Sequence, residues 1–169
     1  SEVVEMTMAF TGFLRISLSR GADYITVERE EQHVANYLQI QSVRYGSIMR
    51  YTIDIDPALH ERYMLKIVLQ PLVENAIHHA RKEEEVLHIA VRIQKEERDV
   101  VFQVTDDGCG IEAEKLIKLR SSLRRSEEGY GLRNVANRVR LAYGENYGVR
   151  IESQEGYGTT VSVRIPVNE

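Results

Sequence analysis

The hydrophobic residues of this chain recur at helix spacing in its first part and alternate with polar residues in much of the remainder. Residues 3–18 repeat apolar side chains at the near-heptad spacing of a helix that packs on other helices. A break follows at residues 19–23. Thr26 then offers an N-cap to a second helix, which we expect to end near Tyr45 with Gly46 as its stop.

These two helices form a hairpin, residues 1–46, that cannot easily bury the apolar sides of both helices alone. The hairpin is therefore either half of a dimerising helical bundle or a pair packed on the next domain. We favour dimerisation and assign residues 47–169 to a second domain.

The second part of the chain mixes strand and helix patterns. Alternation predicts strands over residues 49–55, 86–94, 99–105, 149–153 and 159–165. An apolar stripe from Leu65 to Ile77 predicts one helix, and residues 132–143 form another. The charged stretch 112–128 is either a helix-containing flap, with basic residues able to close over a ligand, or a solvated helix.

Composition narrows the class of protein. The 169 residues are 43% hydrophobic and 28% charged, which is typical of a globular chain with a real core. A net charge of −4 argues against a nucleic-acid partner. The single Cys109 excludes an internal disulfide and suits a reducing compartment. The chain starts with Ser1 inside an apparent helix, so we expect a fragment of a longer protein.

Three glycine-containing stretches carry candidate chemistry. Residues 105–111 follow a strand, and a carboxylate placed just before glycines can accept a hydrogen bond from an exocyclic amine. Residues 129–135 lead directly into a helix, whose free N–H groups form an anion site. Residues 156–161 lie at a hairpin, where a simple turn is the alternative interpretation.

Glu74 and Asn75 lie at the edge of the apolar stripe in the helix that ends near residue 80. A carboxylate and an amide beside a buried face are costly without partners. By spacing alone, Glu74 and Asn75 could equally be the exposed polar edge of a core helix. The three glycine stretches favour instead the interpretation that they are a functional pair.

Two other nucleotide motifs are disfavoured. Residues 108–113 fit the G-x-G-x-x-A pattern of dinucleotide folds, but nearby acidic residues would crowd a pyrophosphate. The neighbouring strands also have the pattern of hairpins instead of βαβ units. No Walker A loop occurs.

Taken in order, these stretches resemble the ATP-binding domain shared by sensor histidine kinases, gyrase-like ATPases and Hsp90-type chaperones. The likeness rests on Glu74-Asn75 (N box), residues 106–110 (G1 box), residues 129–132 (G2 box) and residues 158–160. Within this group, the sequence closely resembles the YesM/LytS-type sensor histidine kinases of bacteria at residues 37–41, 44–46, 69–77 and 131–135.

The resemblance implies a site for ATP and Mg²⁺. Asn75 would coordinate the Mg²⁺ that bridges the phosphates, and Glu74 would assist at the metal or polarise a water. Asp106 would accept from the adenine amino group, and Thr159 would support the adenine end. His78 is either a phosphate contact or a surface histidine.

Glycines and backbone groups complete the implied site. Gly108 and Gly110 would give room for the base and for a lid hinge. Gly129, Gly131 and Leu132 would present backbone N–H groups to phosphate.

The fold implied is α+β: a two-layer α/β sandwich of the Bergerat (GHKL) type, with a mixed, mainly antiparallel sheet under three helices, preceded by the helical hairpin. The function implied is phosphoryl transfer to a histidine outside this chain, and onward to a response-regulator aspartate. The parent protein would be a homodimer through the hairpin and membrane-anchored, with this portion cytoplasmic. The alternatives are a degenerate nucleotide-binding or interaction module and a gyrase- or Hsp90-like ATPase.

Two departures from the family pattern stand out. Nothing matches the family's acceptor-histidine helix, so we expect that this chain does not phosphorylate itself, and we interpret His33 as a surface or dimer-face histidine. Asp107 stands where asparagine is commoner in the G1 box.

Overall fold

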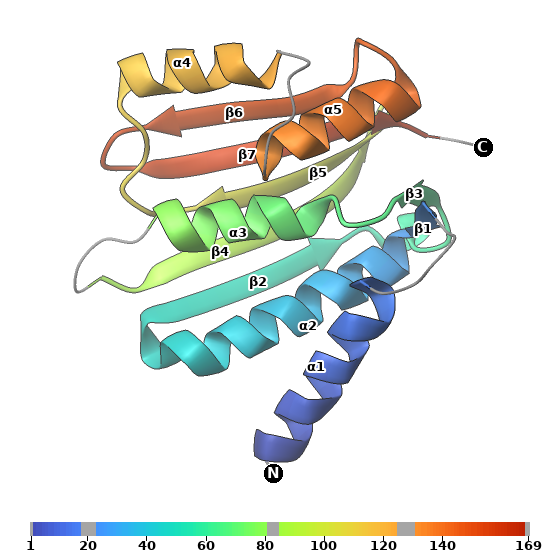
Figure 1. Ribbon diagram of the computed structural model, residues 1–169, viewed down its shortest axis with the longest axis vertical. Helices are drawn as coiled ribbons and strands as arrows, with labels where there is room; N and C mark the ends of the chain where they lie inside the picture. The colour runs from blue at the N-terminus through green and yellow to red at the C-terminus, as the bar shows by residue number, and fades with distance from the viewer. Residues whose placement is uncertain (1, 18–22, 81–84, 125–130, 168–169) are drawn as a thin grey trace.

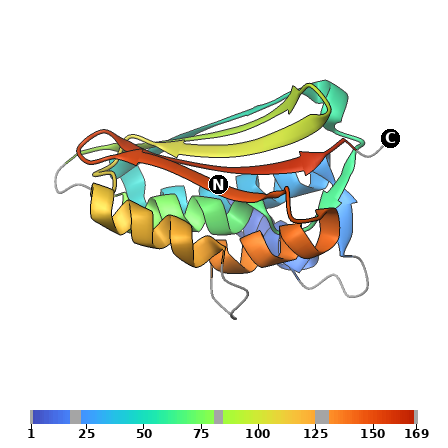
Figure 2. The ribbon, with the colours of Figure 1, turned by 90° about the horizontal axis from the view of Figure 1, so that it is seen from above.

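The computed structural model describes residues 2–17, 23–80, 85–124 and 131–167. A five-stranded sheet of order β2-β4-β5-β7-β6 is covered on one face by helices and open on the other (Figures 1 and 2). The helices are α1 (Glu2–Ser17), α2 (Val27–Tyr45), α3 (Leu69–His79), α4 (Ala113–Leu123) and α5 (Leu132–Tyr143), with short 3₁₀ turns at Gly46–Ile48 and Pro57–Leu59. The strands are β1 (Tyr24–Thr26), β2 (Met49–Ile55), β3 (Tyr63–Leu65), β4 (Leu87–Glu96), β5 (Asp99–Asp106), β6 (Gly148–Gln154) and β7 (Gly158–Pro166).

The sheet is mixed and mainly antiparallel, as expected. Strand β2 pairs with β4 in parallel, and the three remaining pairings are antiparallel. Alternation decides which side chains face the helices: Val100, Phe102 and Val104 of β5 are buried in the core, whereas Thr105 lies on the open face. This alternation also places Asp106 on the helix-covered side.

The second helix has the predicted ends. The Thr26 hydroxyl accepts from the Arg29 N–H at 3.3 Å, and Gly46 ends the helix at φ 57°. Helix α2 packs against α3 and β2, and α1 packs on α2. The hairpin is therefore joined to the sheet domain through its second helix.

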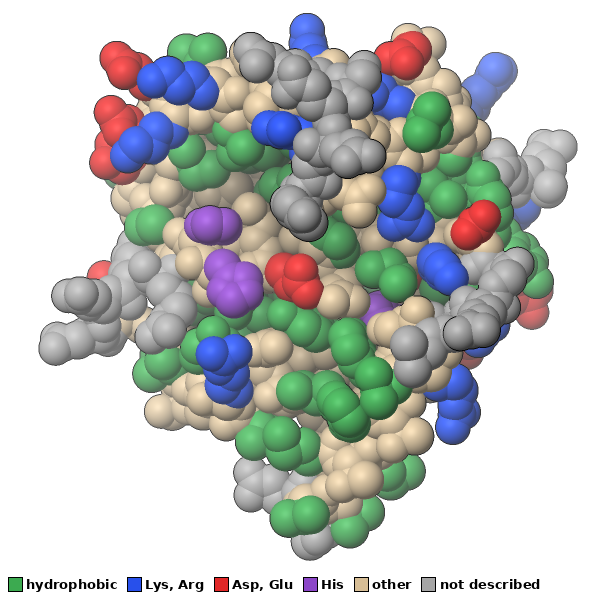
Figure 3. Space-filling model, viewed as in Figure 1, with side chains coloured by type: hydrophobic (Ala, Val, Ile, Leu, Met, Phe, Trp, Pro, Cys, Tyr) green, Lys and Arg blue, Asp and Glu red, His purple; other side chains and the backbone are tan. Residues whose placement is uncertain are grey.

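Helix α1 keeps an apolar surface. Val3, Met8 and Phe10 are exposed, and hydrophobic side chains gather over α1 at the lower end of the view in Figure 3. Dimerisation through this surface, and the division of the chain at residue 46, stay predictions.

The helix predicted from Leu65 begins four residues later, which corrects that boundary. Residues 63–65 form strand β3 instead, which pairs antiparallel with β1 so that Ile25 lies opposite Met64. Ile67 then adopts φ 56°, a conformation that a β-branched residue rarely takes, and this turn redirects the chain into α3.

Two charged side chains hold this turn. The fully buried Glu30 carboxylate accepts from the backbone N–H groups of residues 67–69 at 2.6–2.8 Å. Burial raises the pKa of Glu30, and these three N–H groups oppose that rise. Arg138 of α5 donates to the carbonyl oxygens of Lys66 and Ile67. The start of α3 is thereby fixed to both α2 and α5.

The interpretation of His33 as a surface or dimer-face residue is wrong. Its side chain is 0% exposed and stacks on the Phe13 ring, with the ring centroids 4.8 Å apart. Its Nε2 lies 2.7 Å from Gln70 Oε1. Packing of α2 between α1 and α3 buries it, a tertiary effect that helix spacing alone does not reveal.

Helix α4 is neither a free flap nor a fully solvated helix over its described length. Leu116 and Leu123 are buried, and Arg120 Nε donates to the Ile151 carbonyl oxygen of β6 at 2.9 Å. Lys115 and Lys118 stay exposed, and Arg125 lies outside the described residues. No helix in the described ranges combines the length and apolarity needed to cross a membrane.

Candidate nucleotide site

Asp106 ends strand β5 as a nearly buried carboxylate. It is 5% exposed, and its Oδ1 accepts from the backbone N–H groups of Gly108 at 3.0 Å and Thr159 at 3.3 Å. Burial raises the pKa of Asp106, while the two N–H groups lower it. Both bonds use one oxygen, so Oδ2 is the atom suited to accept from a ligand.

Thr159 lies directly beside Asp106 because the two residues are register partners across β5 and β7. Its hydroxyl is 2.9 Å from Ser153 Oγ on β6. Ser153 also donates to the Gly158 carbonyl and accepts from the Ile111 N–H. Sequence reasoning missed Ser153, since no motif marks a serine whose role depends on strand pairing.

The glycine loop after Asp106 is tied to two other segments. The Cys109 N–H donates to the Ala80 carbonyl at the end of α3 at 2.9 Å, and the Cys109 carbonyl accepts from the Gly156 N–H at 2.7 Å. A Cβ on Gly108 would lie 2.1 Å from the Ala80 oxygen. The absence of a side chain at Gly108 thus permits close backbone packing, and the implied room for a base stays a prediction.

Gly110 has the same function on the other side of the loop. Its φ is +68°, and a Cβ there would lie 2.0 Å from the Gln154 carbonyl oxygen.

Replacing Gly108 by alanine is expected to destabilise the fold by about 1–3 kcal/mol, because backbone atoms of Ala80 must move. Thermal unfolding of Gly108→Ala measures this loss. Cys109→Ala is the matched control in the same loop, since the Cys109 side chain is partly exposed, and we expect a smaller change. Equal melting temperatures for Gly108→Ala and the wild type would contradict the packing account.

Helix α3 carries the N-box pair. Glu74 and Asn75 are half-buried, and because helix neighbours point about 100° apart their side chains diverge. Gln70 Nε2 donates to Glu74 Oε1 at 2.7 Å, toward the α2 side. His78 is exposed one turn after Glu74. The N box therefore offers a metal the carboxylate oxygens of Glu74 and the amide oxygen of Asn75 as ligand atoms.

These oxygens fit Mg²⁺ better than a softer metal. Within the described ranges, no three His, Cys, Asp or Glu side chains gather as a protein cage. Magnesium commonly binds through one or two protein oxygens together with substrate phosphates and water. The amide of Asn75 is suited to that kind of site.

Gly131 is the N-cap residue of helix α5, with φ 62° and no side chain to cap the helix. The first N–H groups of a helix have no partner within it, so those from Leu132 onward are suited to bind an anion. The Leu132 side chain is buried and anchors this end. Gly129 lies outside the described residues.

Asp107 lies on the opposite, open face of the sheet. Its carboxylate binds the backbone N–H and the ring Nδ1 of His88, both at 2.8 Å. Burial acts to raise the pKa of Asp107, but these contacts hold it below its ordinary value. The pair with His88 gives a structural reason for aspartate at this position.

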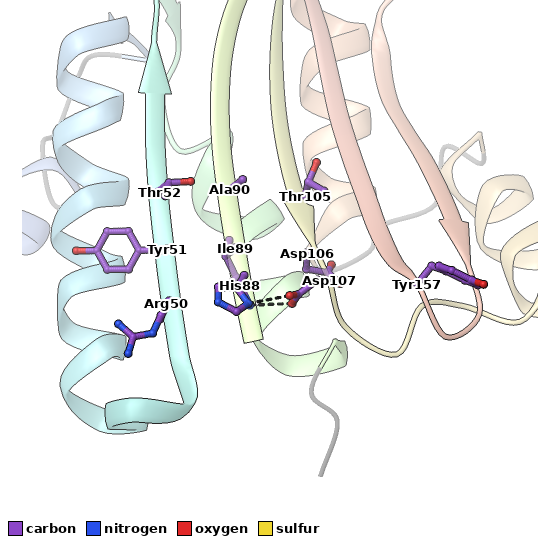
Figure 4. A pocket seen from close by; sticks show the side chains of 10 residues that line it. All are labelled: Arg50, Tyr51, Thr52, His88, Ile89, Ala90, Thr105, Asp106, Asp107 and Tyr157. Atoms are coloured by element: carbon purple, nitrogen blue, oxygen red, sulfur yellow. Dashed lines mark hydrogen bonds and ion pairs between the residues drawn. The ribbon is translucent and has the colours of Figure 1, made fainter. Parts of the chain in front are cut away.

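The His88–Asp107 pair lies in a hollow of about 540 Å³ on this open face. Figure 4 shows the pair between Arg50 of β2 and Tyr157 of the β6–β7 turn. Asp106 borders the hollow only at the sheet edge, with its side chain buried on the helix-covered side. The hollow is therefore distinct from the predicted nucleotide site.

Solved structures share this fold. The catalytic domain of histidine kinase ThkA superposes with a TM-score of 0.63 at 19% identity, covering 85% of this chain and 95% of ThkA's. A histidine kinase ThkA in complex with the response regulator TrrA matches 99% of this chain and 48% of the other, with a TM-score of 0.63 at 16% identity.

Sequence relatives are longer than this chain. The sensor histidine kinase YesM of Bacillus subtilis is 33% identical over 167 residues, which are 98% of this chain and 28% of YesM. Residues 1–49 match the histidine kinase family model. Residues 60–169 match the model described as histidine kinase-, DNA gyrase B- and HSP90-like ATPase. Since the latter match covers most of the sequence, the chain belongs to this ATPase family, and it is similar in sequence to the sensor histidine kinase YesM.

Proposed function

We propose that this chain is the ATP-binding catalytic domain of a two-component sensor histidine kinase. It binds ATP with Mg²⁺ and positions the γ-phosphoryl group for transfer to a histidine outside residues 1–169. The observation that carries the proposal is the Cys109–Ala80 backbone bond, which joins the loop after Asp106 to the end of the Asn75 helix. An adenine acceptor and a metal-binding amide thereby belong to one rigid unit.

Asp106 and Thr159 hold the adenine end in this proposal. The free Asp106 Oδ2 accepts from the adenine amino group, a pairing that guanine cannot make because it carries an oxygen at the equivalent ring position. The Ser153–Thr159 contact at 2.9 Å fixes Thr159 beside it.

The phosphate end uses α3 and α5. Asn75 ligates Mg²⁺, which when bound neutralises charge on the phosphates. Glu74 acts at the metal or on a water. The N–H groups at the start of α5, Gly131 and Leu132 included, hold phosphate oxygens. The exposed His78 adds a phosphate contact in this proposal.

Partners follow from the relatives. The ThkA–TrrA complex supports a response-regulator receiver domain as the acceptor of the phosphoryl group. The exposed apolar side of α1 supports a homodimer through the hairpin. Membrane anchoring of the full-length protein, with this domain on the cytoplasmic side, is proposed from its likeness to YesM.

To test the proposed function, the full-length protein that contains this chain is incubated with γ-labelled ATP and Mg²⁺. We expect acid-labile, base-stable label on a histidine, transfer of that label to a receiver domain, and no label on residues 1–169 alone. Steady ATP hydrolysis without an acceptor would favour a gyrase- or HSP90-like ATPase instead. Absence of both activities would favour a degenerate binding module.

A further inference from the structure

Three polar side chains form a continuous connection between the hairpin and the N-box helix. His33 Nε2 of α2 lies 2.7 Å from Gln70 Oε1, and Gln70 Nε2 lies 2.7 Å from Glu74 Oε1. Gln70 and Glu74 are one turn apart on α3, the spacing at which helix side chains meet.

The connection has a defined direction. A carboxylate can only accept, so the amide NH₂ of Gln70 faces Glu74 and its oxygen faces His33. His33 Nε2 must therefore carry the proton and donate it. Each member holds the next, and the connection ends on one oxygen of the Glu74 carboxylate.

Packing alone does not explain an imidazole at position 33. His33 Nδ1 is buried and has no hydrogen-bond partner within the described part of the chain. An unpaired buried polar atom costs free energy, and an apolar ring stacked on Phe13 would avoid that cost. The start of α3 is already held by Glu30, so His33 is not needed to cap that helix.

We propose that His33 and Gln70 are positioning residues that fix the Glu74 carboxylate for phosphoryl transfer. Gln70, which His33 holds in place, binds Glu74 Oε1 and leaves Oε2 in a set orientation. This inference rests on the proposed function, in which Glu74 acts at the metal or on a water.

The same connection reaches α1. The Phe13 ring packs against the rings of His33 and Tyr37, with ring centroids 4.8 Å and 5.9 Å apart. Burial, followed by the negative charge of Glu74, raises the pKa of Tyr37 to about 12. Helix α1 therefore contacts, through Phe13, the α2 residue that holds Gln70.

The test compares two replacements of His33 in the full-length protein. His33→Phe keeps a ring against Phe13 and removes the donor, and His33→Gln keeps a donor and removes the ring. We expect His33→Phe to lower the rate constant of phosphotransfer by about 10- to 100-fold, with KM for ATP changed by less than about twofold. His33→Gln should recover most of the rate.

Two additions make the test specific. Gln70→Met, which keeps the side-chain volume and removes both hydrogen bonds, should lower the rate as His33→Phe does. It tests the same connection if His33→Phe does not fold. In a Glu74→Gln background, His33→Phe should cause no further loss, because both changes act through one group. His60→Phe is the matched control, since His60 contacts α2 through Glu31 at 3.1 Å near the surface.

The outcomes separate the inference from the proposed function. An active wild type with unchanged rates in His33→Phe and Gln70→Met would overturn the inference. The inference would also be overturned if His33→Phe lowered the rate equally in the Glu74→Gln background, or if it weakened ATP affinity. Either result indicates a structural role for His33. A wild type that transfers no phosphoryl group contradicts the proposed function, and this inference with it.

Discussion

Asn75→Ala is expected to abolish Mg²⁺-dependent ATP binding while leaving the fold intact. The substitution removes the amide oxygen proposed as the metal ligand. Asn75 is half-buried, off the apolar stripe of α3, and alanine is the best helix former, so the helix should persist. We expect a loss of at least about 100-fold in affinity, because even outer-shell changes at metal sites cost about 10- to 100-fold.

Calorimetric titration with and without Mg²⁺ measures this effect, and circular dichroism checks the fold. Asn146→Ala is the matched control. Asn146 is exposed after the far end of the 12-residue helix α5, about 18 Å along the axis from the N–H groups proposed to bind phosphate. Unchanged Mg²⁺-dependent affinity in Asn75→Ala would exclude it as the ligand.

Asp106→Asn is expected to remove the preference for adenine over guanine. Asparagine can still accept from the Gly108 and Thr159 N–H groups through its oxygen, so the strand end keeps its geometry. Its NH₂ group then replaces Oδ2 and faces the adenine amine, donor against donor. The loss of a hydrogen bond to a charged acceptor costs about 1.5–3 kcal/mol, equal to about 10- to 150-fold in affinity.

Asp107→Asn is the control for this substitution. The two aspartates are adjacent in sequence but lie on opposite faces of the sheet, and Asp107 binds His88. We expect Asp107→Asn to leave ATP affinity and base preference unchanged. Equal losses in the two variants would show that the effect comes from loop disruption, and no loss in Asp106→Asn would remove the adenine assignment.

The Asp106→Asn variant should be more stable than the wild type at neutral pH. Because burial raises the folded-state pKa of Asp106, its contribution to stability is fully present below the unfolded pKa and is lost as pH rises through the folded pKa. Asparagine does not ionise, so Asp106→Asn should raise the melting temperature at pH 7 relative to the wild type. A lower melting temperature at pH 7 would mean that the charged carboxylate stabilises the fold.

The parts of the fold that follow from local pattern were predictable. Alternation along β5 places Asp106 and Thr105 on different faces, and the Thr26 and Gly46 caps set the ends of α2. Such features depend on residues close together in sequence.

Features that depend on long-range packing were not predictable. Strand β3 forms only because β1, almost 40 residues earlier, pairs with it. His33 is buried because α1 covers it, and α4 is held by Arg120 on a carbonyl of β6. Gln70 did carry a local signal, since it lies one turn before Glu74, but the signal gains meaning only when His33 is placed beside it.

Calorimetric titration of the wild-type chain with a non-hydrolysable ATP analogue, with and without Mg²⁺ and beside GTP, tests the central claim most directly. The account predicts saturable binding that prefers adenine and strengthens with Mg²⁺. Binding that is equal for ATP and GTP, or absent under both conditions, would contradict a nucleotide site built on Asp106 and Asn75.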